Sequence, residues 1–270
     1  MRINTNINSM RTQEYMRQNQ DKMNTSMNRL SSGKSINSAA DDAAGLAIAT
    51  RMRAKEGGLN VGARNTQDSM SALRTGDAAL GSVSNILLRM RDLATQASNG
   101  TNDTKDITSL NEEYGQLKDE IIHIAEKTNF NGNTFLDKTG GGKDLTIQLS
   151  DTANDNLVIA AINVKAITST TLGTLTGATA AGEMVKLDTA IQNTADARAT
   201  FGSQLNRLDH NLNNVTSQAT NMAAAASQIE DADMAKEMSN MTKFKILNEA
   251  GISMLSQANQ TPQMVSKLLQ

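Results

Sequence analysis

The chain has 270 residues, a formal net charge of −2, one proline and no cysteine, and only 2% of its residues are aromatic. The lack of cysteine excludes disulfides, thiolate zinc sites and cysteine nucleophiles, and the small net charge gives no general attraction to nucleic acid. Aromatic side chains normally supply much of a compact core and proline interrupts helices. The composition therefore favours long helices packed through methionine, alanine and leucine over a globular enzyme.

The N-terminal segment, up to about residue 35, is polar apart from a narrow stripe of isoleucine and methionine. It opens with MRINTNINSM, which has no apolar region of the secretory type; if the protein leaves the cell, it uses another export route. No apolar run in the chain approaches the roughly 18–20 residues of a membrane span. The segment carries six basic and two acidic residues. Nucleic acid or anionic lipid could bind such an arm, but a solvated helix face is the favoured interpretation.

The next stretch, LSSGKSINSAADDAAGLAIA, contains two adjacent aspartates, Asp41 and Asp42. Adjacent residues do not share a helix face, and no histidine or glutamate is near enough in sequence to complete a metal or acid–base site. We expect instead that Asn37 or Ser38 caps a helix and that the aspartates favour its positive N-terminal end.

Two helices are predicted between residues 70 and 124. Apolar residues recur mostly 3 or 4 apart from Met70 to Ala97 and again from Ile107 to Ile124, and the turn cluster SNGTNDT separates the two runs. Each run forms one apolar stripe, so the two helices can bury each other and a third.

The middle of the chain changes character. Turn chemistry at Asn131-Gly132 and two apolar runs, Leu145–Leu149 and Leu157–Val164, predict a small β-hairpin region near residues 130–165. The following segment, 166–182, is rich in threonine, alanine and glycine, and we expect a loosely structured surface connection.

The strongest periodicity lies in the last third of the chain. Steps of 4 and 3 continue for six heptads, which is typical of a coiled-coil seam, and only Thr194 and Arg198 interrupt the apolar series. We therefore predict a mainly α fold, a long-helix coiled-coil bundle with a small β-hairpin region in the middle. The predicted seam comprises Leu187, Ile191, Phe201, Leu205, Leu208, Leu212, Val215, Met222 and Ile229.

The C-terminal segment, from Met234 onward, is another polar segment with a stripe of methionine, isoleucine and leucine. An isolated helix is marginal in water, so the two terminal segments must pack on each other, pack on other copies of the chain, or stay disordered. We expect both to be disordered in the free chain and to become helical on assembly.

No motif points to catalysis or to a cofactor. The two histidines, His123 and His210, lie on different predicted helices, and the H-E-x-x-H pattern is absent. TGGGK, at 139–143, lacks the spacer and final Ser/Thr of a phosphate loop. We expect no enzyme activity, no metal and no cofactor.

Several long motifs resemble bacterial flagellin: LSSGKSINSAADDAAGLAIATRMRA, LLRMRDLATQASNG, TNFNGNTFLD, FGSQLNRLDHNLNNV and SQIEDADMAKEMSNMTKFKILNEAGISMLSQANQTPQMVSKLL. The resemblance implies an extracellular filament for swimming motility, built of many self-associated copies. It also implies an inner core domain, 1–43 plus 231–270, and an outer core domain, 44–230. The large variable outer region of many flagellins is missing here.

The resemblance further implies export through the flagellar export apparatus without a cleavable signal, and contact with filament cap and junction proteins. A flagellar export chaperone is expected to mask the C-terminal arm, because an exposed apolar stripe would drive premature association. The expected anchors are Leu247, Ile252, Leu255, Leu268 and Leu269. No nucleic acid partner and no membrane insertion are expected.

Flagellins are also sensed by a Toll-like receptor, through the helix that contains LLRMRDLATQ and the helix after it. The matching positions are Arg89, Leu93 and Glu113. Helical spacing places Arg89 and Leu93 on a face other than the seam, where the same patch could also contact a neighbouring subunit. A plain solvated helix face is the alternative.

Two other functions stay open on sequence alone. A hook–filament junction protein shares the terminal arms, but it would not grow long filaments by itself. A secreted enzyme or metal-binding protein would need a cluster of ligands, and the sequence offers none.

Overall fold

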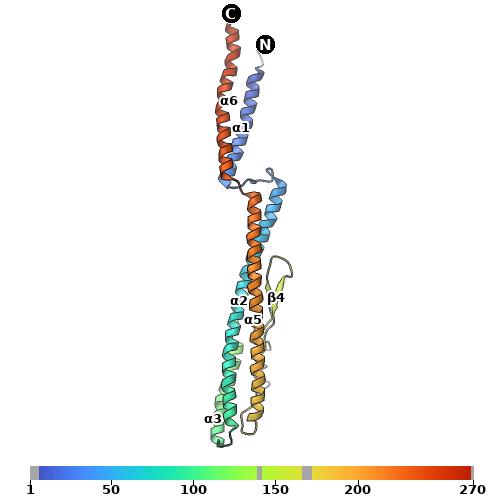
Figure 1. Ribbon diagram of the computed structural model, residues 1–270, viewed down its shortest axis with the longest axis vertical. Helices are drawn as coiled ribbons and strands as arrows, with labels where there is room; N and C mark the ends of the chain where they lie inside the picture. Colours follow the sequence, from blue (N-terminus) through green and yellow to red (C-terminus); the bar gives the residue numbers. More distant parts are fainter. Residues whose placement is uncertain (1–5, 139–141, 166–171, 269–270) are drawn as a thin grey trace. The chain divides into compact units, whose positions relative to one another are not determined.

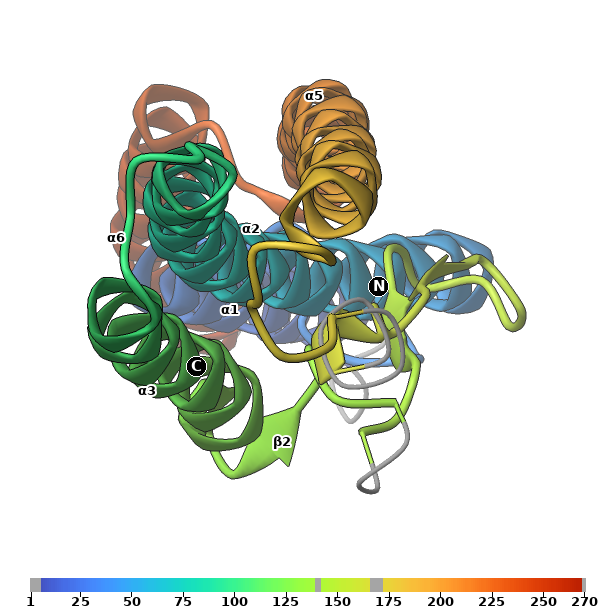
Figure 2. The same ribbon diagram turned by 90° about the horizontal axis from the view of Figure 1, so that it is seen from below.

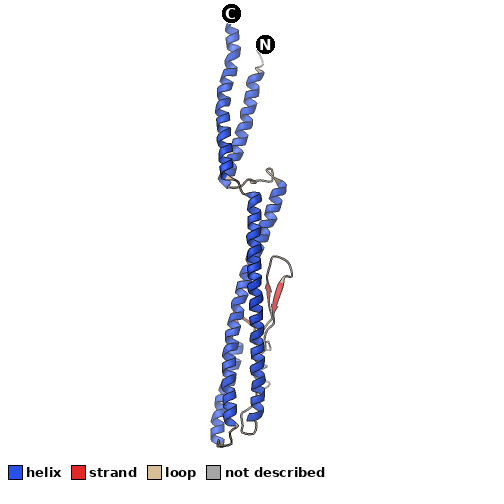
Figure 3. Cartoon of the chain, viewed as in Figure 1, coloured by secondary structure: helices blue, strands red, loops and turns tan. Residues whose placement is uncertain are grey.

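The computed structural model describes residues 6–138, 142–165 and 172–268, and side chains as far as residue 260 (Figure 1). The chain divides into two compact units. We call residues 1–55 with 220–270 the terminal unit, and residues 56–219 the bundle unit. Figure 3 shows that helices dominate and that the strands are short, which confirms the predicted mainly α fold with a small β region.

Three helices build the bundle unit. They are α2 (Ala43–Ala97), of which the part from residue 56 belongs here, α3 (Thr104–Lys127), and α5 (Ala180–Glu230), of which the part up to residue 219 belongs here. Seen along the helices, α2 lies beside both α3 and α5 (Figure 2). Ion pairs join α2 to each neighbour, from Arg89 to Glu113 and from Arg91 to Asp188. The core between them is apolar, with Leu80, Val83, Leu87, Met90, Ile121, Leu187 and Leu208 all fully buried.

The seam of α5 follows the predicted spacing through both units. Leu187, Phe201, Leu208 and Val215 are buried, and Ile191, Leu205, Leu212, Met222 and Ile229 are half-buried. The two polar interruptions have different solutions. Thr194 is buried, and its hydroxyl donates to the carbonyl of Ala190 at 2.8 Å. Arg198 is exposed and pairs with Asp77 on α2 at 2.8 Å.

Two antiparallel strand pairs form the β region. Strands β1 (Asn129–Phe130) and β2 (Asn133–Thr134) are joined by Asn131 and Gly132, both with positive φ, as a tight hairpin turn requires. Strands β3 (Leu145–Gln148) and β4 (Asn156–Ile159) pair from Leu145↔Ile159 to Gln148↔Asn156. The strand β4 ends before Val164, earlier than predicted. The amides of Ile162 and Val164 donate instead to the carbonyls of Phe135 and Leu136.

Two glycines of α2 let this β region approach the bundle. A Cβ at Gly62 would lie 2.5 Å from the carbonyl oxygen of Leu149, and one at Gly76 would lie 2.5 Å from the ring of Phe135. Larger side chains at either position would push the β region off the helix. Glycine inside a helix is normally unfavourable, so here close packing of backbone and ring offsets that cost.

The connection before α5 is more ordered than the sequence predicted, in the part that the structure describes. Residues 166–171 and 139–141 lie outside the described residues. From residue 172 on, Leu172, Leu175 and Ala180 are buried in the core. The carboxylate of Glu183 accepts hydrogen bonds from the Gly173 amide and from the buried Tyr114 hydroxyl. Burial beside Glu183 raises the pKa of Tyr114.

The terminal unit is built on a pair of helices, α1 (Ile7–Ser32) and α6 (Met234–Leu268). They lie side by side and antiparallel, so that the start of α1 and the end of α6 are at the same end of the pair (Figure 1). Of the three arrangements open to the terminal segments, the structure shows them packed on each other. The helix α1 ends at Gly33, whose φ of 73° is left-handed and whose amide donates to the Arg29 carbonyl at 2.9 Å.

Candidate functional site

The α1–α6 pair is held by close packing and by two polar contacts. Met16 of α1 lies over Gly251 of α6, where a Cβ would approach the Met16 Cγ atom to 2.8 Å. The Asn248 side-chain amide donates to Gln20 Oε1 at 2.6 Å, and Asn6 donates to the carbonyl of Ala258 at 2.8 Å. Polar pairs within an apolar seam fix the register of two helices, so these contacts define which residues of α1 face which residues of α6.

Much of the apolar surface of this pair stays uncovered. Single exposed apolar side chains are normal on a protein surface, but here large apolar side chains of both helices are exposed along the described length of the pair. The exposed residues are Ile7, Met10, Tyr15, Met27, Met234, Met238, Ile246, Leu247, Ile252 and Met254. Two helices alone cannot enclose stripes this wide, since each helix can cover only one side of the other.

Two hollows run along the pair. One, of about 610 Å³, is lined by Met10, Met16, Arg17 and Asn248 among others. The second, of about 670 Å³, is lined by residues that include Arg11, Met254 and Ala258. Both mix flexible apolar side chains with amide and guanidinium groups, which is the make-up of protein–protein contact surfaces.

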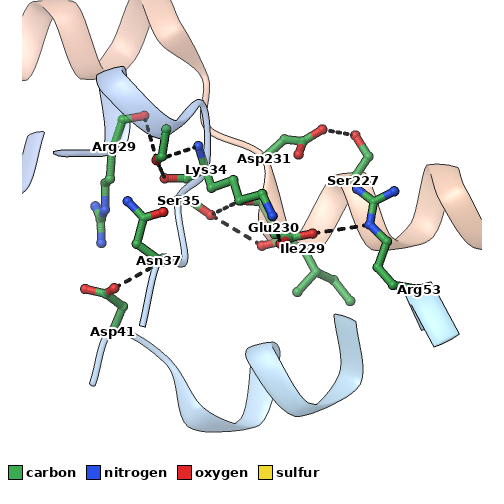
Figure 4. A network of polar contacts seen from close by, with 11 residues as sticks. Arg29, Lys34, Ser35, Asn37, Asp41, Arg53, Ser227, Ile229, Glu230 and Asp231 are labelled. Atoms are coloured by element: carbon green, nitrogen blue, oxygen red, sulfur yellow. Dashed lines mark hydrogen bonds and ion pairs between the residues drawn. The ribbon is translucent and has the colours of Figure 1, made fainter. Parts of the chain in front are cut away.

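At the base of the pair, the connection from α1 to α2 lies against the connection from α5 to α6 (Figure 4). We call this contact the crossing. The chain leaving α1 runs antiparallel to the chain between α5 and α6. The Ser35 amide donates to the carbonyl of Glu230 at 2.7 Å, and the Ala232 amide donates to the carbonyl of Gly33 at 2.9 Å. These backbone bonds tie the two connections together over a very short stretch.

The carboxylate of Glu230 is the centre of this crossing. Its side chain is only 10% exposed, and it pairs with Lys34 and, at 3.4 Å, with Arg53. The hydrogen bond from Lys34 is the main cause that lowers the pKa of Glu230, and Arg53 adds to it. One side chain at the end of α5 thus holds the connection after α1 and the first part of α2.

A second buried carboxylate lies close by on α6. Glu237, also 10% exposed, faces Arg29 of α1 at 3.5 Å. Leaving a buried carboxylate without its partner is costly, so the bases of α1 and α6 are held together by charge as well as by apolar contact.

One aspartate of the LSSGKSINSAADDAAGLAIA stretch, Asp42, caps a helix, so the predicted capping residues Asn37 and Ser38 are wrong. The helix α2 begins at Ala43, and Asp42 Oδ1 accepts hydrogen bonds from the amides of Ala44 and Gly45. Asp41 instead accepts from the Asn37 and Ser38 amides, and the Ser38 amide is the main cause that lowers its pKa. The prediction failed because the chain makes a turn of its own before α2.

The predicted receptor patch on α2 is only partly at the surface. Arg89 and Glu113 meet across α2 and α3, with Nη2 and Oε1 2.8 Å apart, and both side chains are about half exposed. Leu93 is 0% exposed and belongs to the bundle core, so its predicted outward orientation is wrong. The reason is that α2 contacts two neighbours and buries two adjacent stripes, whereas the sequence argument counted one.

The residues predicted to contact an export chaperone lie on α6. Leu247 and Ile252 are exposed, and Leu255 is half-buried. The side chain of Leu268, and all of Leu269, lie outside the described residues.

The described residues contain no cluster of histidine, cysteine or carboxylate side chains that could hold a metal ion. His123 is exposed, with Nδ1 3.9 Å from Glu120 of the same helix, and His210 is exposed. No helix in the described part of the chain is long and apolar enough to cross a membrane.

Sequence reasoning missed Glu230 and Gly251. The signal for Glu230 was available in part, since an acidic residue ends a long apolar seam while Lys34 follows a glycine turn. Their pairing spans 196 residues of sequence, and no local pattern brings such partners together.

Comparison with known proteins finds relatives for both the N-terminal and the C-terminal helical parts of the chain. Residues 3–140 match the model of the bacterial flagellin N-terminal helical region, and residues 184–269 match that of the C-terminal helical region. A flagellin of Listeria monocytogenes is 45% identical over 285 aligned residues, covering 100% of this chain and 99% of the relative.

Solved structures of flagellar proteins are also similar to this chain. The crystal structure of Bacillus cereus flagellin is 70% identical with a TM-score of 0.54, and the match covers 60% of this chain and 94% of that one. A structure described as a putative flagellar hook-associated protein from Vibrio parahaemolyticus has a TM-score of 0.59 at 14% identity, covering 71% of this chain and 100% of that one. At that identity the second match shows a shared fold alone.

Proposed function

Because the chain belongs to the bacterial flagellin family, whose members are structural proteins, we propose that its terminal unit is the main surface through which copies assemble. The chain is a subunit that polymerises with itself into the extracellular flagellar filament. The single observation that supports the terminal unit for this role is the exposed apolar surface of α1 and α6.

Burial of this surface between copies supplies the driving force. Fully burying one large aliphatic side chain is favourable by about 1.5–3 kcal/mol. The exposed side chains of α1 and α6 lie along both helices, so neighbours on several sides can share in covering them. The α1–α6 register set by Gly251 and Asn248 would then determine the shape of the surface that each copy offers.

A matched pair of substitutions tests this role. Ile246 on α6 is 59% exposed and Val185 on α5, in the bundle unit, is 67% exposed. Ile246→Asp should raise the critical concentration for filament growth at least about tenfold, since burying an unpaired carboxylate costs well over 1.4 kcal/mol. Val185→Asp should change it little. Sedimentation and electron microscopy measure both, and equal effects would remove the terminal unit from its proposed role.

Before assembly, the exposed apolar surface of α6 must be bound by another protein to prevent premature association. We propose that the flagellar export chaperone binds α6 in the cell and keeps the chain ready for export through the flagellar apparatus. An amphipathic helix in an apolar groove is a common mode of recognition, and the exposed Leu247 and Ile252 with the half-buried Leu255 support it. Leu268 and Leu269 remain candidates from sequence alone, as do contacts with cap and junction proteins.

Deletion of residues 231–270 should abolish chaperone binding in a pull-down. Ile252→Asp should weaken binding in the full chain, whereas Ile7→Asp on α1, which is similarly exposed, should not. Undiminished binding after the deletion would place the chaperone elsewhere.

On the bundle unit, we propose that Arg89 together with Glu113 forms the part of the patch that a Toll-like receptor contacts and that neighbouring subunits also use. Exposed guanidinium groups can bind a receptor carboxylate in bidentate geometry. Leu93 is buried and supports the patch only from within.

Arg89→Ala in the purified monomer should lower receptor activation and slow filament growth, while Arg74→Ala, an exposed arginine on the same helix, should change neither. Loss of an arginine anchor at the centre of an interface typically costs about 2 kcal/mol or more. If the Arg89 variant stays folded and both readouts are unchanged, the patch is a solvated helix face.

A further inference from the structure

Among the side chains that the structure describes, exposed methionines are confined to the terminal unit. Five methionine side chains are exposed among those described, and all lie on α1 or α6: Met10 at 61%, Met27 at 51%, Met234 at 47%, Met238 at 54% and Met254 at 66%. In the bundle unit Met90 is 0% exposed, and Met70 and Met184 are half-buried. The thioether sulfurs that a dissolved oxidant can reach are therefore concentrated on the terminal unit.

Two of these five methionines lie where the helix pair is hollowed. Met10 lines one hollow together with Met16, and Met254 lines the other. Methionine is unbranched and flexible, so it fills irregular gaps between helices well. Its sulfur is also the one apolar side-chain atom here that mild oxidants convert into a polar group.

We propose that these five methionines are oxidation sites that decide whether a free chain can join a filament. This inference rests on the proposed function of the terminal unit as the assembly surface. The modifying agent is hydrogen peroxide. A lone pair on Sδ attacks one peroxide oxygen, the O–O bond breaks, and the new S–O group gives its proton to the departing hydroxide. The sulfur is oxidised by two electrons to the sulfoxide, and the peroxide is reduced to water.

Oxidation changes the chemistry of the assembly surface without changing the backbone. A sulfoxide is a polar hydrogen-bond acceptor, and burying one between apolar neighbours without a donor is unfavourable. Met234 and Met238 lie one turn apart on the same face of α6, so oxidation of both would place two polar groups side by side. In an assembled filament, neighbouring copies would cover the same sulfurs and slow the reaction.

The test treats free chain and preassembled filament with hydrogen peroxide and measures sulfoxide at each methionine by peptide mass spectrometry. In the free chain, the five sites should be oxidised well before Met90. In the filament, they should be oxidised at least several-fold more slowly. The critical concentration of the treated free chain should rise about tenfold or more. A tenfold rise corresponds to a loss of about 1.4 kcal/mol in the free energy of adding one subunit. Two methionine sulfoxide reductases, one for each sulfoxide epimer, should together restore the original critical concentration.

Two matched variants separate these sites from the rest of the chain. One replaces every methionine of α1 and α6, the five exposed ones included, with leucine, which is apolar and does not form a sulfoxide. The other replaces Met70, Met90 and Met184 with leucine. Each variant is compared only with its own untreated sample. Peroxide should leave the critical concentration of the first variant unchanged and should raise that of the second as much as that of the original chain.

The outcomes are distinguishable. If filaments protect the five sites but the oxidised chain assembles at its former critical concentration, the inference is wrong and the assembly surface stands. If peroxide impairs the variant without methionine on α1 and α6 as much as the original chain, other residues carry the effect and the inference is also wrong. If the five sites are oxidised equally fast in filament and free chain, neighbours do not cover them, and the proposed function of the terminal unit fails as well.

Discussion

The two units of this chain place large apolar side chains in opposite ways. In the bundle unit, Leu80, Leu87 and Ile121 are fully buried, because α2, α3 and α5 enclose a common core. In the terminal unit, α1 and α6 follow a similar apolar spacing but leave residues such as Met10 and Ile252 exposed. One kind of sequence pattern thus gives a self-sufficient core with three helices and an incomplete one with two. The number of partners within the chain decides which part folds alone and which part waits for another copy.

The largest difference should appear in amide hydrogen exchange of the unassembled chain. Amides of the bundle core should exchange only through near-global unfolding, which for a small domain costs about 5–15 kcal/mol. Amides of α1 and α6 should exchange through local opening close to 0 kcal/mol, as the sequence argument expects of arms that are disordered before assembly. In filaments the two sets should become similar. Strong protection of α1 and α6 in the free chain would show that the pair is complete by itself.

A pair of truncating substitutions should show the same contrast in stability. Leu87→Ala removes a fully buried side chain and should lower the free energy of unfolding of the monomer by about 2–5 kcal/mol. Ile246→Ala, at a 59% exposed position, should change it by no more than about 0.5 kcal/mol. Urea unfolding followed by circular dichroism measures both. A large loss for the α6 variant would mean that its surface is already buried within one chain.

Two glycine substitutions should separate close packing from helix propensity. Gly202→Ala on α5 places its Cβ in open space and should stabilise by about 1 kcal/mol through helix propensity. Gly251→Ala gains the same propensity but forces Met16 to move, which typically costs about 1–3 kcal/mol. The melting temperature of filaments should therefore rise for Gly202→Ala and stay level or fall for Gly251→Ala. A rise of equal size in both would mean that α1 and α6 are not held as closely as described.

The smallest effect concerns pH at the crossing. The pKa of Glu230 is lowered in the folded chain, mainly by the hydrogen bond from Lys34. Ionised Glu230 therefore stabilises the folded chain at pH values above its ordinary pKa of 4.5. This stabilisation is lost as the pH falls through the lowered pKa of the folded chain. For a pair with partly exposed partners it amounts to about 1 kcal/mol. Exchange at the Ser35 and Ala232 amides, corrected for intrinsic pH dependence, should therefore speed up below about pH 4.5.

Glu230→Gln is the control for that measurement, because it keeps the shape of the side chain and cannot titrate. Its Ser35 and Ala232 amides should show no change of protection in the same pH range. The pKa of Asp41 in the same unit is also lowered, mainly by the Ser38 amide, so persistence of the change in Glu230→Gln would assign it to another carboxylate such as Asp41.

Most of the helical architecture could be predicted from sequence, because heptad spacing is a local property. The α5 seam is one example, and the hairpin at Asn131-Gly132 is another, since both residues favour positive φ. What could not be predicted depends on how many neighbours an element has. Leu93 was placed outward because the sequence does not state that α2 buries two stripes.

The crossing was hidden for a related reason. Lys34, Arg53 and Glu230 are ordinary charged residues in sequence, and their meaning comes from contacts between segments nearly 200 residues apart. The role of Gly251 could not be predicted either, because it depends on Met16, which packs against this glycine from another helix. For the candidate assembly surface, sequence identified the apolar residues but not the contacts that orient them.

Because α1 pairs with α6, the terminal helix pair can form only in a chain that contains both helices. The first helix of the chain has as its partner the last one, so a polypeptide cut short by premature termination or proteolysis anywhere before α6 carries an α1 with nothing to pair against. A chain cut between α5 and α6 could still fold the bundle of α2, α3 and α5, yet it would lack half of the proposed assembly surface. A growing polymer would thereby reject incomplete chains by geometry, with no separate proofreading factor.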